Sequence, residues 1–185
     1  LQGDWSSDVC SSDLNLDSCS STQTYLKEFL ENNNKNHEKR ILVTSKEQTE
    51  GKGRGENSWH HFPGNLAMSC LIKPNDQLTS LPLKIGLIIS QLIKKDFNQD
   101  IYLKWPNDLM SSDGKKVGGI ICSLIGDSII VGIGINLKKE KANVDFTFTH
   151  LDTKQEILAP DFADRKSTRL NQSPCNLVCR LLLEK

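Results

Sequence analysis

Residues 117–135 read VGGIICSLIGDSIIVGIGI and decide the fold, because two apolar, β-branched runs flank the short turn Gly126-Asp127. That pattern predicts a β-hairpin with strands over residues 117–124 and 128–135. Gly132 and Gly134 occupy alternate positions of the second strand, so they lie on one face of the sheet and leave it without side chains there. The gap would accommodate either a flat ligand or a tightly packed helix.

Helical and strand patterns alternate along the rest of the chain. A largely apolar helix is predicted over Leu81–Lys95, and an amphipathic one over Thr22–Glu31, with N-cap candidates at its start. Strands are expected at Ile41–Thr44, Asn65–Ile72 and Ile101–Lys104, the last ending where Trp105-Pro106 interrupts the pattern. Intermixed strands and helices predict an α/β (α+β) fold.

The 185 residues carry 23 Lys and Arg against 23 Asp and Glu, a formal net charge of zero. A chain-wide positive field for nucleic acid is therefore excluded, although a local cationic site is not. No apolar run reaches the roughly 20 residues of a membrane helix, and the first residues lack a signal-peptide pattern, so a soluble, cytoplasmic protein is expected. Cys70 and Cys122 lie in apolar stretches and are expected in the core, while the spacing of Cys175 and Cys179 does not predict zinc.

The two ends differ from the middle of the chain. Residues 1–14 hold a near-repeat of Ser-Ser-Asp with little apolar periodicity, and residues 165–185 begin with the polar run RKSTRLNQSPC. We interpret both as tails foreign to the domain. The domain is then expected to span residues 15–164 and to be truncated on its C-terminal side.

Three further segments combine charge with glycine, proline or amide groups. In Gly51-Lys52-Gly53-Arg54-Gly55 the glycines allow close backbone approach to a ligand and the cations face an anion, although a flexible surface loop has the same composition. Its spacing is neither a Walker loop nor a dinucleotide fingerprint.

The segment Lys104-Trp105-Pro106-Asn107-Asp108 places an amide and a carboxylate at a strand end, where ligands gather, or forms an ordinary turn. Residues 114–120, GKKVGGI, place lysines beside glycines at a strand entry, or form a solvated hairpin turn.

Taken in order, these motifs resemble the biotin protein ligase family. The series is Ser21-Thr22-Gln23, then Gln48 with residues 51–54 and Trp59, then KWPND at 104–108, then Lys116 with Gly119-Ile120, and finally residues 132–136, GIGIN. It covers about residues 17–140, and KWPND is its most specific part. The resemblance implies a catalytic domain related to class II aminoacyl-tRNA synthetases, with a mixed β-sheet flanked by helices. It also implies that biotin is joined to ATP as biotinyl-5′-AMP and then passed to a lysine of a biotin carboxyl carrier protein.

The resemblance also assigns site residues. Biotin would be bound by Ser21, Thr22, Gln48, Gly51, Lys52, Arg54, Lys116, Gly119, Gly132 and Gly134. ATP would be bound by Arg54, Trp59, Asn107, Asp108, Lys116 and Asn136. A carboxylate attacks a phosphate in this reaction, so two anions meet and catalysis needs positive charge where negative charge develops. Lys116 and Arg54 are therefore expected to be catalytic, together with Asp108, which would hold Mg²⁺, orient a cation or take the proton of the acceptor lysine.

The chain departs from the family pattern in the Gly-rich loop. Lys52 stands where the loop G-R-G-R-x-G has its first arginine, which keeps the charge but loses the planar guanidinium, so looser retention of the adenylate is expected. The alternatives are a lipoate or octanoate ligase, against which KWPND and the Gly-rich loop argue, and a truncated, non-catalytic biotin-binding fragment. The expected partners are the carrier protein and, as an option, a second copy of the chain in a homodimer. Nucleic acid and membranes are not expected.

Overall fold

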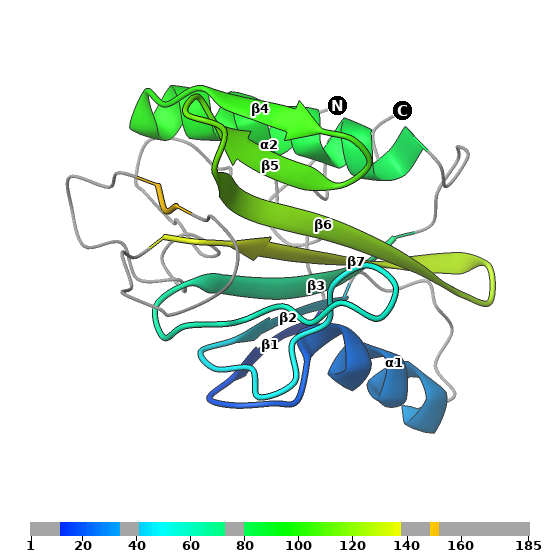
Figure 1. Cartoon of the computed structure of the whole chain (residues 1–185). Coiled ribbons are helices and arrows are strands. Elements are labelled where there is room, and N and C mark those ends of the chain that lie inside the picture. Colours follow the sequence, from blue (N-terminus) through cyan, green and yellow to red (C-terminus); the bar gives the residue numbers. More distant parts are fainter. Residues whose placement is uncertain (1–11, 34–40, 73–79, 138–148, 152–185) are drawn as a thin grey trace, which may run out of the picture.

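The computed structural model describes residues 12–33, 41–72, 80–137 and 149–151. Its elements in chain order are β1 (Ser12–Leu16), α1 (Thr22–Asn33), β2 (Ile41–Ser45), β3 (Leu66–Ile72), α2 (Leu81–Phe97), β4 (Ile101–Lys104), β5 (Asp108–Ser111), β6 (Lys116–Ile125) and β7 (Ser128–Ile135). In Figure 1 the strands form one twisted sheet, with α2 beside β4 and β5 and α1 near the opposite end. Neither described helix is long and apolar enough to cross a membrane.

The strands are hydrogen-bonded in the order β1-β2-β3-β7-β6-β5-β4. β1 and β2 run parallel, and the other neighbouring pairs of the described sheet are antiparallel. β6 and β7 form the predicted hairpin, and Ile125 pairs with Ser128 across its turn. Gly126 in that turn has a φ of +55°, a conformation that favours glycine. The mixed sheet with flanking helices confirms the predicted fold class.

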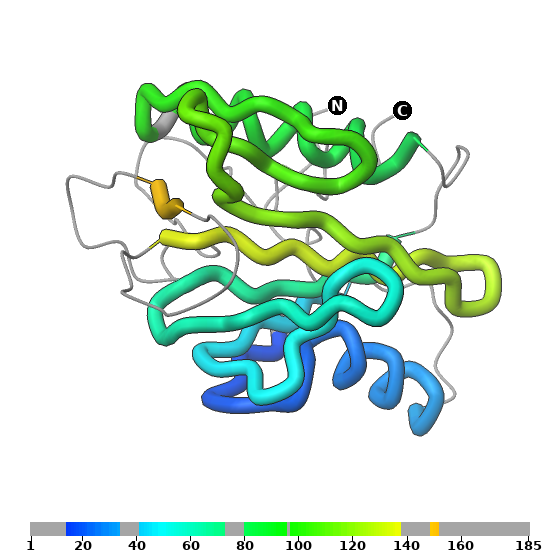
Figure 2. The backbone as a smooth tube through the Cα atoms, viewed as in Figure 1, coloured from blue at the N-terminus to red at the C-terminus, as the bar shows by residue number. Residues whose placement is uncertain are grey.

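The two faces of the sheet pack against different helices. On one face, α2 buries Ile85, Ile89 and Ile93, spaced four residues apart, in a core that also contains Ile120 and Ile133 of the central hairpin. On the other face, α1 buries Leu26 and Leu30 against Val43, Leu71 and Ile130. The trace in Figure 2 shows the two helices at opposite ends of the sheet, which leaves the middle strands between them.

Helix α1 covers only part of its face of the sheet. Beyond the N-terminus of α1, that face of the sheet carries small residues. Gly134 pairs with Ala67 on one side and with Gly119 on the other, while Gly132 pairs with Ser69 in the adjacent row. Directly opposite residues of an antiparallel pair point to the same side of the sheet. These residues therefore form a trough beyond the N-terminus of α1, which is where the site is built.

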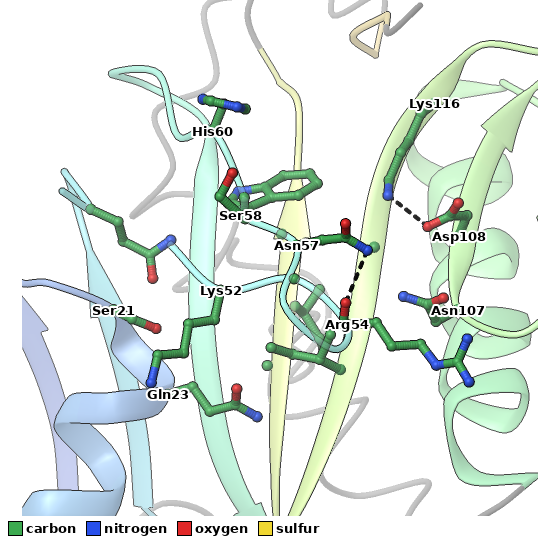
Figure 3. Close-up of a pocket in the computed structure, with 18 of the residues that line it drawn as sticks. Ser21, Gln23, Lys52, Arg54, Asn57, Ser58, His60, Asn107, Asp108 and Lys116 are labelled. Atoms are coloured by element: carbon green, nitrogen blue, oxygen red, sulfur yellow. Dashed lines mark hydrogen bonds and ion pairs between the residues drawn. The ribbon is translucent and has the colours of Figure 1, made fainter. Parts of the chain in front are cut away.

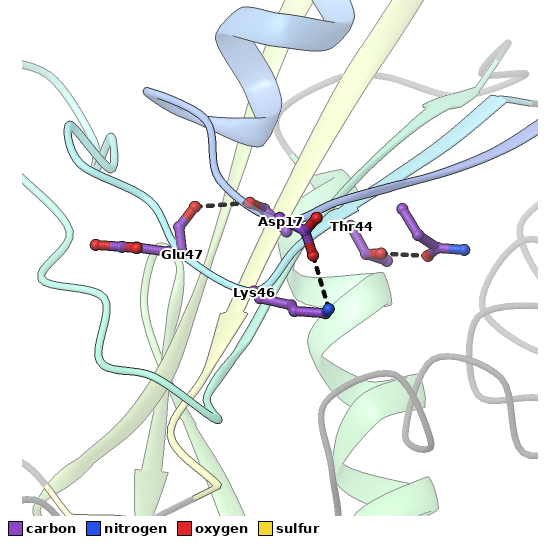
Figure 4. A network of polar contacts seen from close by, with 6 residues as sticks. Asp17, Thr44, Lys46 and Glu47 are labelled. Atoms are coloured by element: carbon purple, nitrogen blue, oxygen red, sulfur yellow. Dashed lines mark hydrogen bonds and ion pairs between the residues drawn. The ribbon is translucent and has the colours of Figure 1, made fainter.

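The elements predicted from periodicity are confirmed, but two short strands, β1 and β5, were not predicted. β5 begins at Asp108, inside the KWPND motif, where Pro-Asn-Asp is typical of a turn. β1 begins at Ser12, within the segment interpreted as an N-terminal tail, and residues 1–11 lie outside the described residues. Side chains also connect β1 to β2: Thr44 Oγ1 donates to Asn15 Oδ1 at 2.5 Å. In Figure 4 Lys46 reaches Asp17 in an exposed ion pair of 2.7 Å, beside Glu47.

The cysteines follow the prediction in part. Cys70 is fully buried in the α2 core, as expected. Cys122 is only half-buried and packs against the margin of that core. Cys175 and Cys179 lie outside the described residues.

Candidate active site

A cavity of about 800 Å³ lies over the trough of small residues. Its volume falls within the range of about 300–1,000 Å³ that is typical of small-molecule sites. The side chains that line it come from the start of α1, the Gly-rich loop, the β4–β5 turn and the strands of the central hairpin. Among the lining residues are Ser21, Thr22, Gln48, Lys52, Arg54, Trp59, Asn107, Asp108, Lys116, Gly119, Gly132, Gly134 and Asn136. Of the predicted site residues, Gly51 is not part of this lining.

The inner end of the cavity is a buried hydrogen-bonded cluster at the N-terminus of α1. Gln48 Oε1 accepts from the Thr22 backbone N–H at 2.8 Å and from Thr22 Oγ1 at 3.1 Å. Thr22 Oγ1 also lies 2.9 Å from Ser69 Oγ on β3. Ser21 and Thr22 are 2% and 3% exposed, so this polar cluster is shielded from bulk water and hydrogen bonds made there are strengthened.

The other end of the cavity carries an ion pair between β5 and β6. Lys116 Nζ lies 2.7 Å from Asp108 Oδ1, and both side chains are roughly three-quarters buried. The same Nζ lies 5.8 Å from the centroid of the Trp59 ring, within cation–π range. Asp108 pairs with Gly119 in the ladder, which places its carboxylate beside the glycine row. Lys116 is thus held by an anion on one side and an aromatic ring on the other.

The Gly-rich loop folds back on itself and carries its two cations to different parts of the cavity. Trp59 N donates to Gly51 O at 2.7 Å, Gly53 N donates to Asn57 O at 2.8 Å, and Gly55 has a φ of +64°. Gly51 lies so close to the Trp59 carbonyl that a Cβ at position 51 would collide with it, which explains why this position requires glycine. Figure 3 shows the Lys52 side chain on the side of Ser21 and Gln23, and the Arg54 side chain extending toward Asn107.

The two glycines of β7 differ in what lies above them. A Cβ at Gly134 would come within 2.6 Å of Trp59 Cε2, so the indole ring rests directly on this glycine. A Cβ at Gly132 would meet Ile121 Cγ1 at 3.0 Å and Ser69 Oγ at 3.6 Å, beside the buried polar cluster. Of the two alternatives for this gap, a packed helix is wrong for the described part of the chain, because the Trp59 indole lies over Gly134 and Gly132 lines the cavity.

Asn107 and Asn136, two of the asparagines that line the cavity, are held differently. Asn136 is 4% exposed, and its amide nitrogen donates to Thr149 O at 3.1 Å while its amide oxygen accepts from Asn65 at 3.4 Å. Asn107 accepts at its backbone oxygen from Ile120 N at 2.9 Å, which fixes the KWPND turn against β6. The peptide bond before Pro106 in that turn is cis.

Several polar residues of the cavity were not assigned to the site from the sequence, among them Gln23 and Ser69. Gln23 Nε2 donates to Ser123 Oγ at 3.2 Å and to Ile130 O at 3.5 Å, and its side chain reaches the cavity wall. The signal for Gln23 was its place directly after Ser21-Thr22. Ser69 had a weaker signal, as the one polar residue in the apolar strand LAMSCLI.

Burial shifts the pKa of several titratable groups in the described residues, among them His61 and Cys122. It lowers the pKa of His61 below its ordinary value of 6.5, against the opposing effects of a hydrogen bond to Lys46 O and the charge of Glu47. His61 lies two residues after Trp59, so it anchors the end of the Gly-rich loop through its Nε2, 3.0 Å from that carbonyl. Burial also raises the pKa of the Cys122 thiol to about 12.

A sequence profile described as the Biotin/lipoate A/B protein ligase family matches residues 16–140. The chain therefore belongs to this family. It is 33% identical over 158 residues to the bifunctional ligase/repressor BirA of Bacillus subtilis, which covers 80% of this chain and 47% of BirA. It is 32% identical over 124 residues to the biotin–protein ligase of Homo sapiens, which covers 56% of this chain and 16% of that protein.

The fold of the chain is similar to that of a solved biotin protein ligase. The biotin protein ligase from Aquifex aeolicus in complex with biotin and ATP has a TM-score of 0.73 and 28% identity, over 94% of this chain and 69% of that one. The chain spans about half the length of the Bacillus subtilis relative that it matches. The family is thus defined by both sequence and fold.

Proposed function

We propose that this chain is the catalytic part of a biotin–protein ligase, which activates biotin with ATP and transfers it to a carrier protein. The observation that carries the proposal is the arrangement of one cavity with a buried, neutral hydrogen-bonding cluster at one end and the Lys116–Asp108 pair at the other. Biotin has a polar cyclic urea at one end and a carboxylate at the other. Its two ends match the two ends of the cavity.

The urea end would bind at the N-terminus of α1. The buried hydroxyl groups of Thr22 and Ser21 and the partly buried amide of Gln48 suit a urea, because each polar atom of a buried ligand needs a partner. The glycines at 132 and 119 leave room for the bicyclic ring and the acyl chain on the sheet. Lys52 reaches toward this end of the cavity and would supply a further donor there (Figure 3).

The carboxylate end would lie beside Lys116. In the first step a carboxylate oxygen of biotin attacks the α-phosphorus of ATP, the bond from that phosphorus to the bridging oxygen breaks, and pyrophosphate leaves with biotinyl-5′-AMP formed. Lys116 would offset the repulsion between the two anions, and Arg54 would bind the phosphate with its planar guanidinium. Asp108 supports this role because its ion pair keeps Lys116 Nζ fixed before the substrates arrive.

ATP would lie toward the KWPND turn, with Asn107, Asn136 and Trp59 forming its surroundings. The described residues hold no group of three His, Cys, Asp or Glu that would form a metal cage. Mg²⁺ commonly binds through one carboxylate together with phosphate oxygens, and Asp108 is a carboxylate of that kind. Bound there, Mg²⁺ would neutralise charge on the triphosphate.

The second step transfers the biotinyl group to a protein. The amine of an acceptor lysine attacks the acyl carbon, the bond to the phosphate oxygen breaks, and AMP leaves as the amide forms. The amine loses a proton in this step, and Asp108 is the nearest described carboxylate to Lys116 that would accept it. A biotin carboxyl carrier protein is the proposed acceptor, and a homodimer of the chain is the proposed option for assembly.

The test is pyrophosphate release by the purified chain with ATP and Mg²⁺, supplied with biotin, lipoate or octanoate in turn. Release with biotin alone is the expected result, and release with lipoate or octanoate instead would favour the alternative ligases. Binding of biotin by calorimetry without any pyrophosphate release would favour a non-catalytic binding fragment.

Lys116→Ala provides the corresponding test of mechanism. We expect kcat for pyrophosphate release to fall by about 10²–10³, the scale for removing one preorganised electrostatic group. Lys115→Ala is the matched control, because this neighbouring lysine pairs with Asp113 at 2.6 Å in the β5–β6 turn and does not line the cavity. Equal activity in the two variants would reject the role of Lys116.

A further inference from the structure

Ser69 on β3 is a cavity-lining residue that no motif includes. Its side chain is fully buried, at 0% exposure, and its Oγ lies 2.9 Å from Thr22 Oγ1. It pairs in the ladder with Gly132, whose missing side chain leaves the hydroxyl facing the cavity rather than a neighbouring Cβ. The polar cluster therefore has a third member that comes from the middle of an apolar strand.

The hydrogen bonds of this cluster have a defined direction. The Thr22 backbone N–H only donates, so the Gln48 atom at 2.8 Å from it must be the amide oxygen Oε1. An amide oxygen only accepts, so the single hydroxyl proton of Thr22 is donated to Oε1, at 3.1 Å. Thr22 then has no proton left for Ser69, and the bond of 2.9 Å between the two hydroxyls must be donated by Ser69.

This direction sets what the cluster presents to a ligand. The Gln48 Nε2 amide group remains as a donor; it lies 3.3 Å from the Cβ position of Gly51, at the base of the Gly-rich loop. The Ser69 oxygen, whose proton is committed to Thr22, remains as an acceptor. A donor and an acceptor that both bond to Thr22 through their residues are complementary to a cyclic urea, which offers a carbonyl and N–H groups. They have no complement in an alkyl chain or a dithiolane ring.

We propose that Ser69 is a positioning residue that orients Thr22 and Gln48 toward the urea end of the acid and so selects acids that carry a cyclic urea. The inference rests on the proposed function and extends it to a specificity determinant. Ser69 acts by donating to Thr22 Oγ1, a bond that holds the Thr22 hydroxyl in the orientation from which it donates to Gln48 Oε1. Without it the Thr22 hydroxyl is free to rotate, and the amide of Gln48 loses one of its two fixed contacts.

The test is calorimetric binding of biotin and of desthiobiotin, which keeps the cyclic urea but lacks the thioether ring, to the full chain and its Ser69→Ala variant. We expect the Kd for both ligands to rise about tenfold, because the buried Thr22 hydroxyl loses the hydrogen bond that Ser69 donates to it. Ser128→Ala is the matched control: Ser128 is also 0% exposed, on neighbouring β7, and its Oγ has no hydrogen-bond partner among the described residues. The control should bind both ligands like the wild type.

A double-mutant cycle separates positioning from a general loss of packing. Thr22→Val keeps the volume of Thr22 and removes its hydroxyl, so Ser69→Ala should have no further effect on the Kd in that background. A tenfold effect that persists in the Thr22→Val background would overturn the proposal, as would an unchanged Kd in Ser69→Ala. Wild-type chain that fails to bind biotin would overturn the proposed function together with this inference, whereas normal wild-type binding with a neutral Ser69→Ala overturns this inference alone.

Discussion

Gly134→Ala isolates the contact between the Gly-rich loop and the sheet. A Cβ at this position would lie 2.6 Å from Trp59 Cε2, 2.7 Å from Cζ2 and 3.0 Å from Nε1. Carbon atoms in contact prefer about 3.5–4.0 Å, so the indole ring must retreat by about 1 Å. Overpacking of this size typically costs about 1–3 kcal/mol, and we expect the free energy of unfolding to fall by that amount.

Gly119→Ala is the matched control, because Gly119 is directly opposite Gly134 in the β6–β7 ladder. A Cβ there would have its nearest heavy atom, Lys116 Cε, at 3.7 Å, which is ordinary van der Waals contact. Removing glycine from a strand interior without a clash is expected to be neutral or to stabilise by about 0.5–1 kcal/mol. The two alanine variants should therefore differ in the sign of their effect.

Urea unfolding of four proteins measures the effect: wild type, Gly134→Ala, Trp59→Ala and the double variant. If the indole ring is the cause, Gly134→Ala should cost nothing in the Trp59→Ala background. The same loss in both backgrounds would refute the reasoning, because the strain would then lie in the strand itself. A Gly119→Ala variant as unstable as Gly134→Ala would refute it as well.

Three further predictions concern the cavity, the loop and the core. Gly132→Val should abolish biotin binding in calorimetry but keep the folded circular dichroism spectrum, because its side chain would fill the space beside Ser69 and Ile121; an unfolded variant would indicate a packing role instead. The lowered pKa of His61 means that the unfolded chain binds more protons between that value and 6.5, so the stability that His61 contributes is complete above about pH 6.5 and is lost on acidification. His61→Asn should therefore flatten the decline of the unfolding midpoint between about pH 7 and pH 5, and an unchanged decline would contradict this. Since burial raises the pKa of Cys122 to about 12, iodoacetamide at about pH 8 should label it only after unfolding, as judged by peptide mass mapping; rapid labelling of the folded chain would show that the thiol is accessible.

Much of the fold was predictable because its signals are local. The runs around Gly126-Asp127 predict a hairpin through strand length and turn chemistry, and the spacing of Ile85, Ile89 and Ile93 predicts a helix with one buried face. β1 and β5 escaped prediction because their local signals point elsewhere. β1 lies in a polar segment rich in Ser and Asp, β5 begins inside the Pro-Asn-Asp turn pattern, and their place in the sheet depends on hydrogen bonds to β2 and β6.

The motifs of the sequence, which lie far apart in the chain, specify the residue types that are available for the site. How these residues meet depends on the folding of the whole chain: Thr22 bonds to Gln48, 26 residues away, and to Ser69, 47 residues away. Folding also fills the gap above Gly134 with the protein's own Trp59. The physical reason is that side-chain contacts across a sheet depend on register and on the path of a loop, and neither leaves a periodic mark in the sequence.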